Sequence, residues 1–122
     1  MHGPQFEVQQ WEGVRLIKAS GHIDAVNFAD LANVIIRSML EVTPALVLDC
    51  AAVTYIESAQ LQHLADLAQA ARNRGGNLVC AGMCPAIRTV ARLVTAENSL
   101  KCCANLAEAL YHFSATPTTA VA

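Results

Sequence analysis

The sequence has few charged residues, and those that it has form no concentrated patch. Charged residues make up 15% of the 122 residues, and the formal net charge is -2. The eight lysines and arginines are spread from Arg15 to Lys101, so the basic stripe typical of nucleic-acid-binding proteins is missing. Hydrophobic residues make up 54%, which is ample for one packed domain in a chain of this length. We therefore expect one globular domain that binds no nucleic acid.

Long hydrophobic runs are also missing. An Asp, Arg or Glu interrupts each apolar stretch well before the roughly 18 residues that a membrane span requires. The first ten residues, MHGPQFEVQQ, have neither the basic nor the apolar segment of a secretory signal peptide. Together these features predict a cytoplasmic protein without direct membrane insertion.

The five cysteines lack the patterns of disulfide frameworks and zinc sites. Their number is odd and two of them are adjacent, which is a poor basis for disulfide pairing. No C-x-x-C pair occurs. The metal-ligand set left open by the spacing would be drawn from Cys80, Cys84, Cys102, Cys103 and His112. We favour reduced thiols that pack as small apolar side chains, and we expect no metal and no cofactor.

Catalytic motifs are missing as well. There is no glycine-rich phosphate loop, and no G-x-S-x-G surrounds Ser58. Cys50 and His63 stay open as a nucleophile pair, although no third residue is marked to orient them. Asp49 ends a predicted buried strand, where α/β sheets often bind ligands, but a lone carboxylate there more often accepts backbone hydrogen bonds. We therefore expect the protein not to be an enzyme.

Hydrophobic periodicity divides the chain into strands and helices. Apolar alternation and continuous apolar runs predict strands over residues 6–10, 14–20, 45–50, 77–81 and 100–103. Helical spacing of apolar residues predicts helices over residues 25–40, 58–73, 85–93 and 105–113. Residues 21–24 are expected to break the second strand, and residues 51–57 to form a linker.

This order of elements predicts an α/β fold. We expect a single domain over residues 1–113, with a mixed sheet of four to five strands and about four helices. We expect residues 114–122 to form a disordered tail, because they are small and rich in threonine. One core is predicted around the sheet, formed by Leu46, Val47, Leu48, Leu61, Leu64, Leu78, Val79 and Leu110.

The helix over residues 58–73 has two distinct faces. Its inward stripe is predicted to contain Leu61, Leu64, Ala65, Ala68 and Ala71. Its outward face is predicted to contain Ala59, Gln62, His63, Asp66, Gln69 and Ala70. Ser58 is predicted to be the N-cap, with its hydroxyl bonded to a free backbone N–H.

Two stretches of the sequence resemble the STAS domain of anti-sigma factor antagonists. Gly21-His-Ile-Asp24 resembles the family's G-x-[IL]-D at a strand-to-helix junction. Residues 46–58, LVLDCAAVTYIES, resemble its apolar strand that ends in Asp-Ser at the start of the second helix. The resemblance extends from about Phe6 to Phe113. It implies a mixed sheet with helices and a regulatory function through partner binding.

The resemblance also implies a docking site at the start of the second helix. In phosphorylated members this segment reads D-S-[ST]-G, and an anti-sigma kinase of the GHKL ATPase type binds there and phosphorylates the second hydroxyl residue. Carried over to this chain, the docking site contains Asp24, Glu57, Ser58 and Ala59. Helical geometry adds Gln62, His63 and Asp66 as partner-binding residues, because they share the outward face of Ala59. A phosphate at this position would add close to two negative charges to the interface and weaken docking.

The chain departs from the family pattern at the acceptor. Glu57 stands in place of the Asp, Ala59 in place of the acceptor, and Gln60 in place of the Gly. Alanine cannot carry a phosphate, so we expect docking without this phosphorylation switch. Ser58 is the possible substitute acceptor, although we favour its role as the helix cap. The resemblance leaves a second function open, that of an accessory STAS subunit on the ATPase of a lipid-transporting ABC complex.

Overall fold

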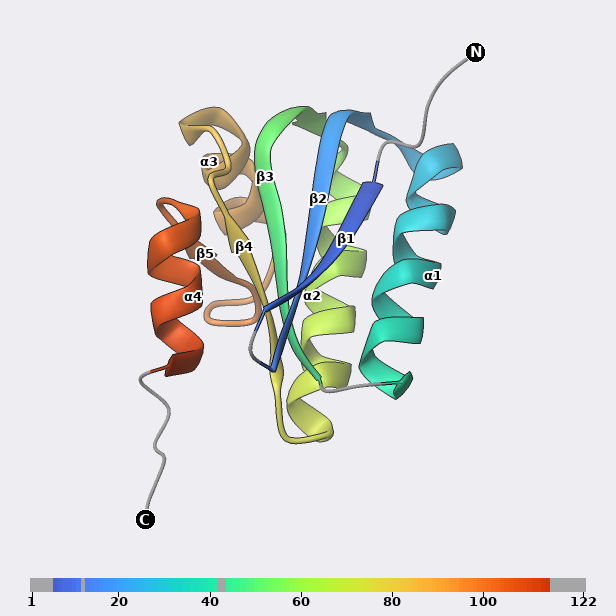
Figure 1. Cartoon of the computed structure of the whole chain (residues 1–122). Helices are drawn as coiled ribbons and strands as arrows, with labels where there is room; N and C mark the ends of the chain where they lie inside the picture. Colours follow the sequence, from blue (N-terminus) through green and yellow to red (C-terminus); the bar gives the residue numbers. More distant parts are fainter. Residues whose placement is uncertain (1–5, 12, 42–43, 115–122) are drawn as a thin grey trace.

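Five strands and four helices make up the described residues, 6–11, 13–41 and 44–114, of the computed structural model (Figure 1). In chain order they are β1 (Phe6–Trp11), β2 (Val14–Ile23), α1 (Ala25–Glu41), β3 (Ala45–Ile56), α2 (Ser58–Asn73), β4 (Asn77–Ala81), α3 (Pro85–Val94), β5 (Lys101–Cys103) and α4 (Leu106–Ser114). The predicted α/β fold with a mixed sheet is confirmed. Of the predicted tail, residues 115–122 lie outside the described residues.

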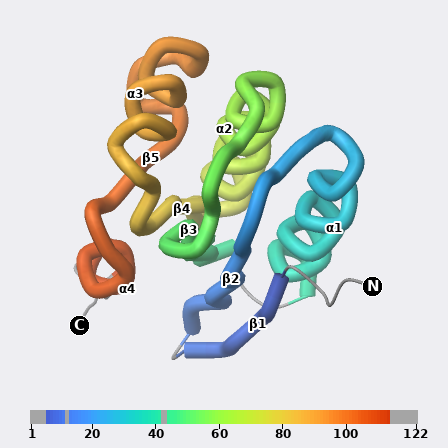
Figure 2. Tube along the Cα trace, turned by 90° about the horizontal axis from the view of Figure 1, so that it is seen from above, coloured from blue at the N-terminus to red at the C-terminus, as the bar shows by residue number. Residues whose placement is uncertain are grey.

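The sheet has the order β1-β2-β3-β4-β5, with β1 antiparallel to β2 and the other neighbours parallel. Each crossover from β2 to β5 therefore steps to the next strand in the same direction. Since such crossovers are right-handed, they place α1, α2 and α3 on one face of the sheet. The last helix, α4, covers the other face (Figures 1 and 2).

The two faces of the sheet bury two separate hydrophobic clusters, so the prediction of a single core was wrong. The larger cluster lies under α1, α2 and α3 and contains Leu48, Leu61 and Leu64. Val47 and Val79 belong to the smaller cluster under α4, because adjacent residues of a strand point to opposite faces. Leu110 is only partly buried against this smaller cluster.

β3 is longer than its sequence suggests, and residues 51–56 of the predicted linker are strand. The apolar run ends at Cys50, but pairing with β2 continues through Ser20–Ala52 and Ile23–Ile56. Alanine has a low strand propensity, so the neighbouring strand determines the conformation of this segment. Asp49 consequently lies inside β3, where its carboxylate accepts a hydrogen bond from the backbone N–H of Ala51 at 3.1 Å.

β2 likewise continues to Ile23, beyond the break predicted at residues 21–24. Its register with β3 shifts twice, between Lys18 and Ser20 and between Gly21 and His22. Gly21 has a φ of 79°, which a residue without a side chain adopts at little cost. A bulge therefore bends the strand where a break was expected.

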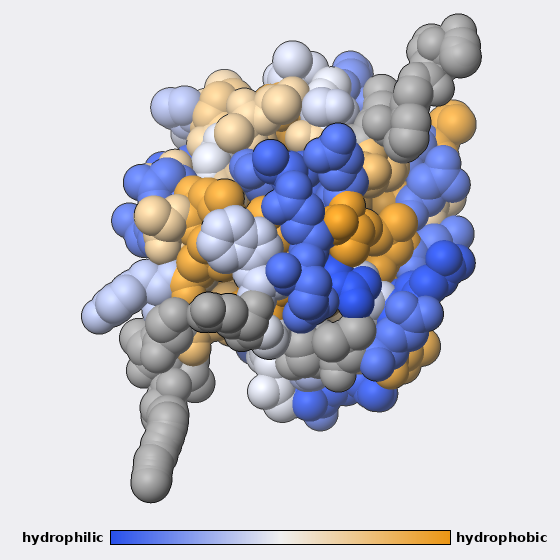
Figure 3. Space-filling model, viewed as in Figure 1, coloured by the Kyte–Doolittle hydropathy of each residue, from blue (hydrophilic) through white to orange (hydrophobic). Residues whose placement is uncertain are grey.

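β1 is an exposed edge strand. Five of its six residues are exposed, and Val8 and Trp11 are among them. In the view of Figure 3 a band of hydrophilic side chains lies over β1 and β2. Within the described residues, none of the helices is both long enough and apolar enough to cross a membrane.

Candidate functional site

The carboxyl ends of β2 and β3 meet the first turns of α1 and α2 at one edge of the sheet. This follows from the parallel pairing of the two strands, in which Ile23 lies opposite Ile56. The backbone N–H of Glu57 donates to the carbonyl of Ile23 at 3.2 Å and holds the two chain segments together. Figure 2 looks onto this edge, where the starts of α1 and α2 lie near each other. The two segments that carry the family resemblance are therefore adjacent in space.

Asp24 lies at this junction, as predicted, but its carboxylate stabilises the start of α1. One carboxylate oxygen accepts hydrogen bonds from the N–H groups of Val26 and Asn27, both at 3.0 Å. The side-chain oxygen of Asn27 accepts in return from the N–H of Asp24 at 2.9 Å. This reciprocal capping satisfies the free donors of the first helical turn.

The start of α2 differs from the prediction at one residue. Glu57 is the N-cap, with extended backbone angles (φ -68°, ψ 148°), and its side chain makes no cap hydrogen bond. Ser58, predicted as the N-cap, is instead the first residue of the helix and is exposed. The helix begins at Ser58 as predicted, but the N-cap is Glu57, because pairing of β3 continues to Ile56 and leaves only Glu57 between strand and helix. The Glu57 carboxylate lies 3.6 Å from Nε2 of His22.

The predicted helical phase of α2 is confirmed except at Ala70, which is half-buried against the larger cluster. Ala59, Gln62, His63 and Asp66 are all exposed, whereas Leu61 and Leu64 are fully buried. Two of the exposed side chains also have partners inside the protein. The Gln62 amide donates to the carbonyl of Val94 at 3.2 Å, and Nδ1 of His63 lies 3.2 Å from the buried side-chain oxygen of Gln60.

Three exposed residues beside this site were missed by the sequence reasoning. The rings of His22 and Tyr55 contact each other edge to face, with their centroids 5.2 Å apart. Val26, in the first turn of α1, is 84% exposed. A longer β3 in the prediction would have pointed to Tyr55, two residues before Glu57. His22 and Val26 have no comparable signal in the sequence, since their exposure depends on how α1 and α2 pack.

Three cysteines lie on neighbouring strands under the helices. Cys80 on β4 lies opposite Cys102 on β5 in the strand register, and Cys50 on β3 belongs to the same hydrophobic cluster. The hydrogen bond with Cys80 and burial both raise the pKa of Cys102. The pKa of Cys80 is also raised: the bond from Cys102 lowers it, but the bond with Cys50 and burial outweigh this. The surroundings of Cys80 and Cys102 therefore favour the protonated form of these two thiols.

The other chemical alternatives gain no support from the geometry. Over the described ranges, no three His, Cys, Asp or Glu side chains are grouped so that they could hold a metal ion. The Cys50 thiol donates to the carbonyl of Leu48 at 3.7 Å, and the His63 ring faces Gln60 and Phe28. The structure thus does not bring together the nucleophile pair that the sequence left open.

We expect the thiols to react according to their exposure. Cys84 is exposed, Cys102 is half-buried, and Cys50, Cys80 and Cys103 are buried. The folded protein is titrated with a coloured thiol reagent, without prior treatment with a reductant. One thiol should react fast, and the substitution Cys84→Ser should remove this fast reaction. In denaturant all five should react, and a chelator should leave the melting temperature unchanged. Fewer than five thiols in denaturant would indicate a disulfide, and a chelator-induced loss of stability would indicate a bound metal.

Comparison with known proteins gives one family and a set of similar structures. The model of the STAS domain family matches residues 5–109. No protein with a curated description matches the chain by sequence. An anti-sigma factor antagonist from Mycobacterium paratuberculosis is 26% identical, with a TM-score of 0.68 over 92% of this chain and 97% of that one.

Two further solved structures share the fold at lower identity. A variant of RsbS from Moorella thermoacetica is 14% identical, with a TM-score of 0.73 over 90% of this chain and 95% of that one. The anti-sigma factor antagonist SpoIIAA of Bacillus, in its unphosphorylated form, is 11% identical, with a TM-score of 0.70 over 93% and 99% of the two chains.

Proposed function

The chain belongs to the STAS domain family, and from this premise we propose that it is a regulatory module, without catalytic activity, that docks onto a partner protein. The docking site that we propose is the edge of the sheet where β2 and β3 lead into α1 and α2. We call it the junction surface. It consists of the predicted residues Asp24, Glu57, Ser58, Ala59, Gln62, His63 and Asp66 with the neighbouring His22, Val26 and Tyr55.

The exposure of Ala59 carries this proposal. It stands at the second position of α2 and is exposed, while the next two residues, Gln60 and Leu61, are buried. A partner that covers the start of α2 must therefore remove water from whatever side chain stands at position 59. For a methyl group this removal is favourable, whereas for a charged group without a partner it is costly. With alanine here, docking does not depend on phosphorylation at position 59.

The surroundings of Ala59 suit a protein interface. Val26 and Tyr55 are exposed apolar or aromatic side chains, and interfaces are enriched in aromatic residues. His22 and Glu57 add a half-exposed pair of polar side chains, which can bond to a partner at the rim. The junction surface thus combines exposed apolar side chains with polar groups that can bond to a partner.

We further propose that the partner is an anti-sigma factor kinase of the GHKL ATPase type. The support is the similarity to solved anti-sigma factor antagonists, of which SpoIIAA has been solved in unphosphorylated and phosphorylated forms. The five free thiols agree with a location in the reducing cytoplasm. An ABC-transporter ATPase remains the alternative partner. A gene for an anti-sigma kinase next to the gene of this chain would favour the first partner, and genes for an ABC transporter would favour the second.

Ser58 is the substitute acceptor in this proposal. Because Glu57 occupies the N-cap, the Ser58 hydroxyl lies in the first turn of α2 and is exposed. A phosphate on it would be stabilised by the free N–H groups of the helix start. Phosphorylation would then repel the partner without unfolding the domain.

The test is a substitution that introduces charge at the centre of the junction surface. The partner is first captured from native cells and identified by mass spectrometry, and its affinity for the purified chain is measured. We expect Ala59→Glu to weaken this affinity by about tenfold or more, because the new carboxylate is buried on docking. The melting temperature should change little, since acidic residues stabilise a first helical turn.

The matched control is Ala107→Glu. Ala107 is also an exposed alanine at the second position of a helix, but it lies on α4 at the opposite face of the sheet. This variant adds the same charge and should bind the partner with unchanged affinity. Equal affinity of Ala59→Glu and Ala107→Glu would place the interface elsewhere. A large fall in melting temperature for Ala59→Glu would instead mean that Ala59 is part of the core.

A further inference from the structure

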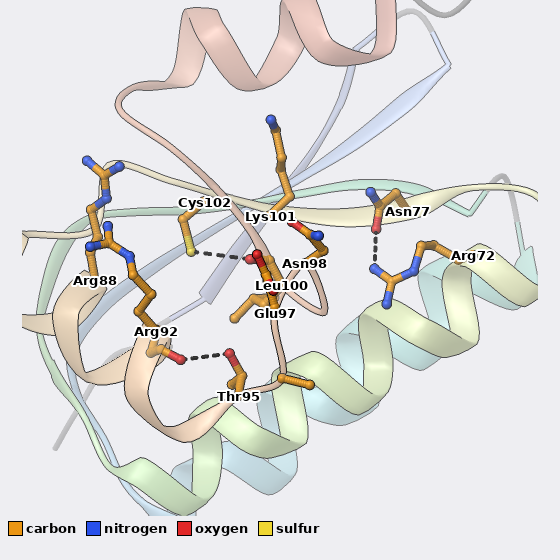
Figure 4. A pocket seen from close by; sticks show the side chains of 12 residues that line it. Arg72, Asn77, Arg88, Arg92, Thr95, Glu97, Asn98, Leu100, Lys101 and Cys102 are labelled. Carbon is orange, nitrogen blue, oxygen red and sulfur yellow. Dashed lines mark hydrogen bonds between the residues drawn. The ribbon is translucent and has the colours of Figure 1, made fainter.

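A hollow of about 700 Å³ lies between the C-terminal half of α2, α3 and the edge strand β5 (Figure 4). It includes Arg72 near the end of α2, whereas the junction surface is at the beginning of that helix. Its volume falls in the range of small-molecule sites, roughly 300–1,000 Å³. Its wall combines polar side chains with apolar ones such as Ala91 and Leu100.

The hollow concentrates positive charge in a chain that is otherwise slightly acidic. Four of the eight lysines and arginines of the sequence line it, together with a single acidic residue, Glu97. The overall formal charge is -2. The four cations are Arg72, Arg88, Arg92 and Lys101. This placement singles out the hollow as the most basic feature of the described structure.

Two of these cations are already engaged or directed elsewhere. Arg72 donates to the side chains of Asn77 and Gln69, both at 3.1 Å, and to the carbonyl of Ser99 at 3.2 Å. Lys101 leaves β5 on the side of α4 in Figure 4 and lowers the pKa of His112 there, after the larger effect of burial. The charges left for a ligand are those of Arg88 and Arg92.

Arg88 and Arg92 stand side by side on α3, and Glu97, the acidic residue of the hollow, forms no ion pair with either of them. They are four residues apart on α3, and both guanidinium groups lie near Cys102, where they act to lower its pKa. In Figure 4 both side chains extend toward the same side of α3. Neither side chain has a hydrogen bond or ion pair with any described residue. Like charges at this spacing repel each other, so the arrangement is unfavourable without an anion.

The Nε–H group of Arg88 is an independent sign of a missing partner. This atom is buried and has no hydrogen-bond acceptor within the described residues. A buried donor without an acceptor costs free energy, and native proteins rarely leave one unsatisfied. An anion in the hollow that accepts from Arg88 and Arg92 would remove both this cost and the repulsion.

We propose that the hollow binds a small phosphate-bearing anion through Arg88 and Arg92. A phosphate group has several acceptor oxygens and up to two negative charges, and it matches the planar fork of donors on a guanidinium group. A carboxylate carries one charge and would leave one arginine uncompensated. The volume of the hollow leaves room for more than a single phosphate, so a diphosphate or a phosphorylated small molecule fits the same wall.

The test is isothermal titration calorimetry of the full chain with inorganic phosphate and with pyrophosphate, and with acetate at matched ionic strength. We expect saturable binding of one pyrophosphate per chain, weaker binding of phosphate and no binding of acetate. Arg92→Gln should weaken pyrophosphate binding about tenfold or more, because it removes a charged donor. Arg92 is exposed, so the variant should fold normally. Arg92→Lys keeps the charge but loses the planar fork of donors. Its affinity for pyrophosphate should lie between those of the unmodified protein and Arg92→Gln.

The matched control is Arg37→Gln, which removes the same charge from the exposed face of α1. It should bind pyrophosphate like the unmodified protein, and so should Ala59→Glu, whose effect is confined to partner docking. Absence of saturable binding of phosphate and pyrophosphate would overturn the proposal. So would equal weakening by Arg37→Gln and Arg92→Gln, since binding would then reflect overall charge. Acetate binding as tight as that of phosphate would also overturn it.

Discussion

Replacing Leu48 by alanine is expected to lower the free energy of unfolding by about 2–5 kcal/mol. Leu48 is fully buried in the middle of β3, in the larger hydrophobic cluster. Its backbone pairs with Ile17 on one side and Cys80 on the other, so β3 is held in place and cannot shift to close the space left by the lost side chain. The cost therefore includes both the lost burial and the cavity left behind.

Equilibrium denaturation in urea measures this loss, with Leu93→Ala as the control. Leu93 is 79% exposed on α3, so its truncation should change stability by less than about 0.5 kcal/mol. The slope of the transition should be the same for all three proteins, since the fold is unchanged. A midpoint for Leu48→Ala within error of the unmodified protein would show that β3 does not pack as described.

Replacing Gly76 by alanine is expected to cost about 3 kcal/mol, since overpacking of this kind costs about 1–3 kcal/mol and occasionally more. An added Cβ would lie only 2.4 Å from the carbonyl oxygen of Pro44 and 2.5 Å from its carbonyl carbon. Hydrogen bonds hold the backbone at both Pro44 and Gly76, so neither can move away to relieve the contact. The same Pro44 oxygen accepts a hydrogen bond from Asn77 at 3.0 Å, and the N–H of Gly76 donates to Ala71 at 2.9 Å. The substitution thus forces apart the starts of β3 and β4.

Gly75→Ala is the matched control for this effect, measured by the same denaturation experiment. Gly75 has a φ of 92°, but no atom lies within 4 Å of an added Cβ. Alanine there is strained only by its backbone conformation, at a cost of about 1 kcal/mol. Gly76→Ala should therefore be clearly the less stable of the two. Equal costs would mean that a small backbone shift relieves the contact with Pro44.

Several elements of the fold could be predicted from the sequence because their signals are local. The helical phase of α2, with Leu61 and Leu64 inside and Ala59 and His63 outside, follows from spacing along one helix. The bounds of β4 were predicted correctly because a short apolar run there is closed by glycine on both sides. Such patterns need no knowledge of distant parts of the chain.

The misassigned segments are those whose conformation depends on pairing between distant residues. Residues 51–56 are strand because β2 lies beside them, and β2 continues past Gly21 because a bulge adjusts its register to β3. The N-cap of α2 moved from Ser58 to Glu57 for the same reason. Local propensity could not show this, because the partner strand supplies the stabilising hydrogen bonds.

The candidate sites divide in the same way. The sequence by itself determined that position 59 carries a side chain that cannot be phosphorylated, and its resemblance to the STAS family placed Asp24 beside the start of α2. Only the tertiary structure decided that His22, Val26 and Tyr55 are exposed near them, and that Arg88 and Arg92 line a hollow without an ion pair to any described residue. The physical reason is that motifs and periodicity record neighbours along the chain. Exposure and missing partners depend on which elements pack against one another, which here is decided by parallel pairing of strands far apart in sequence.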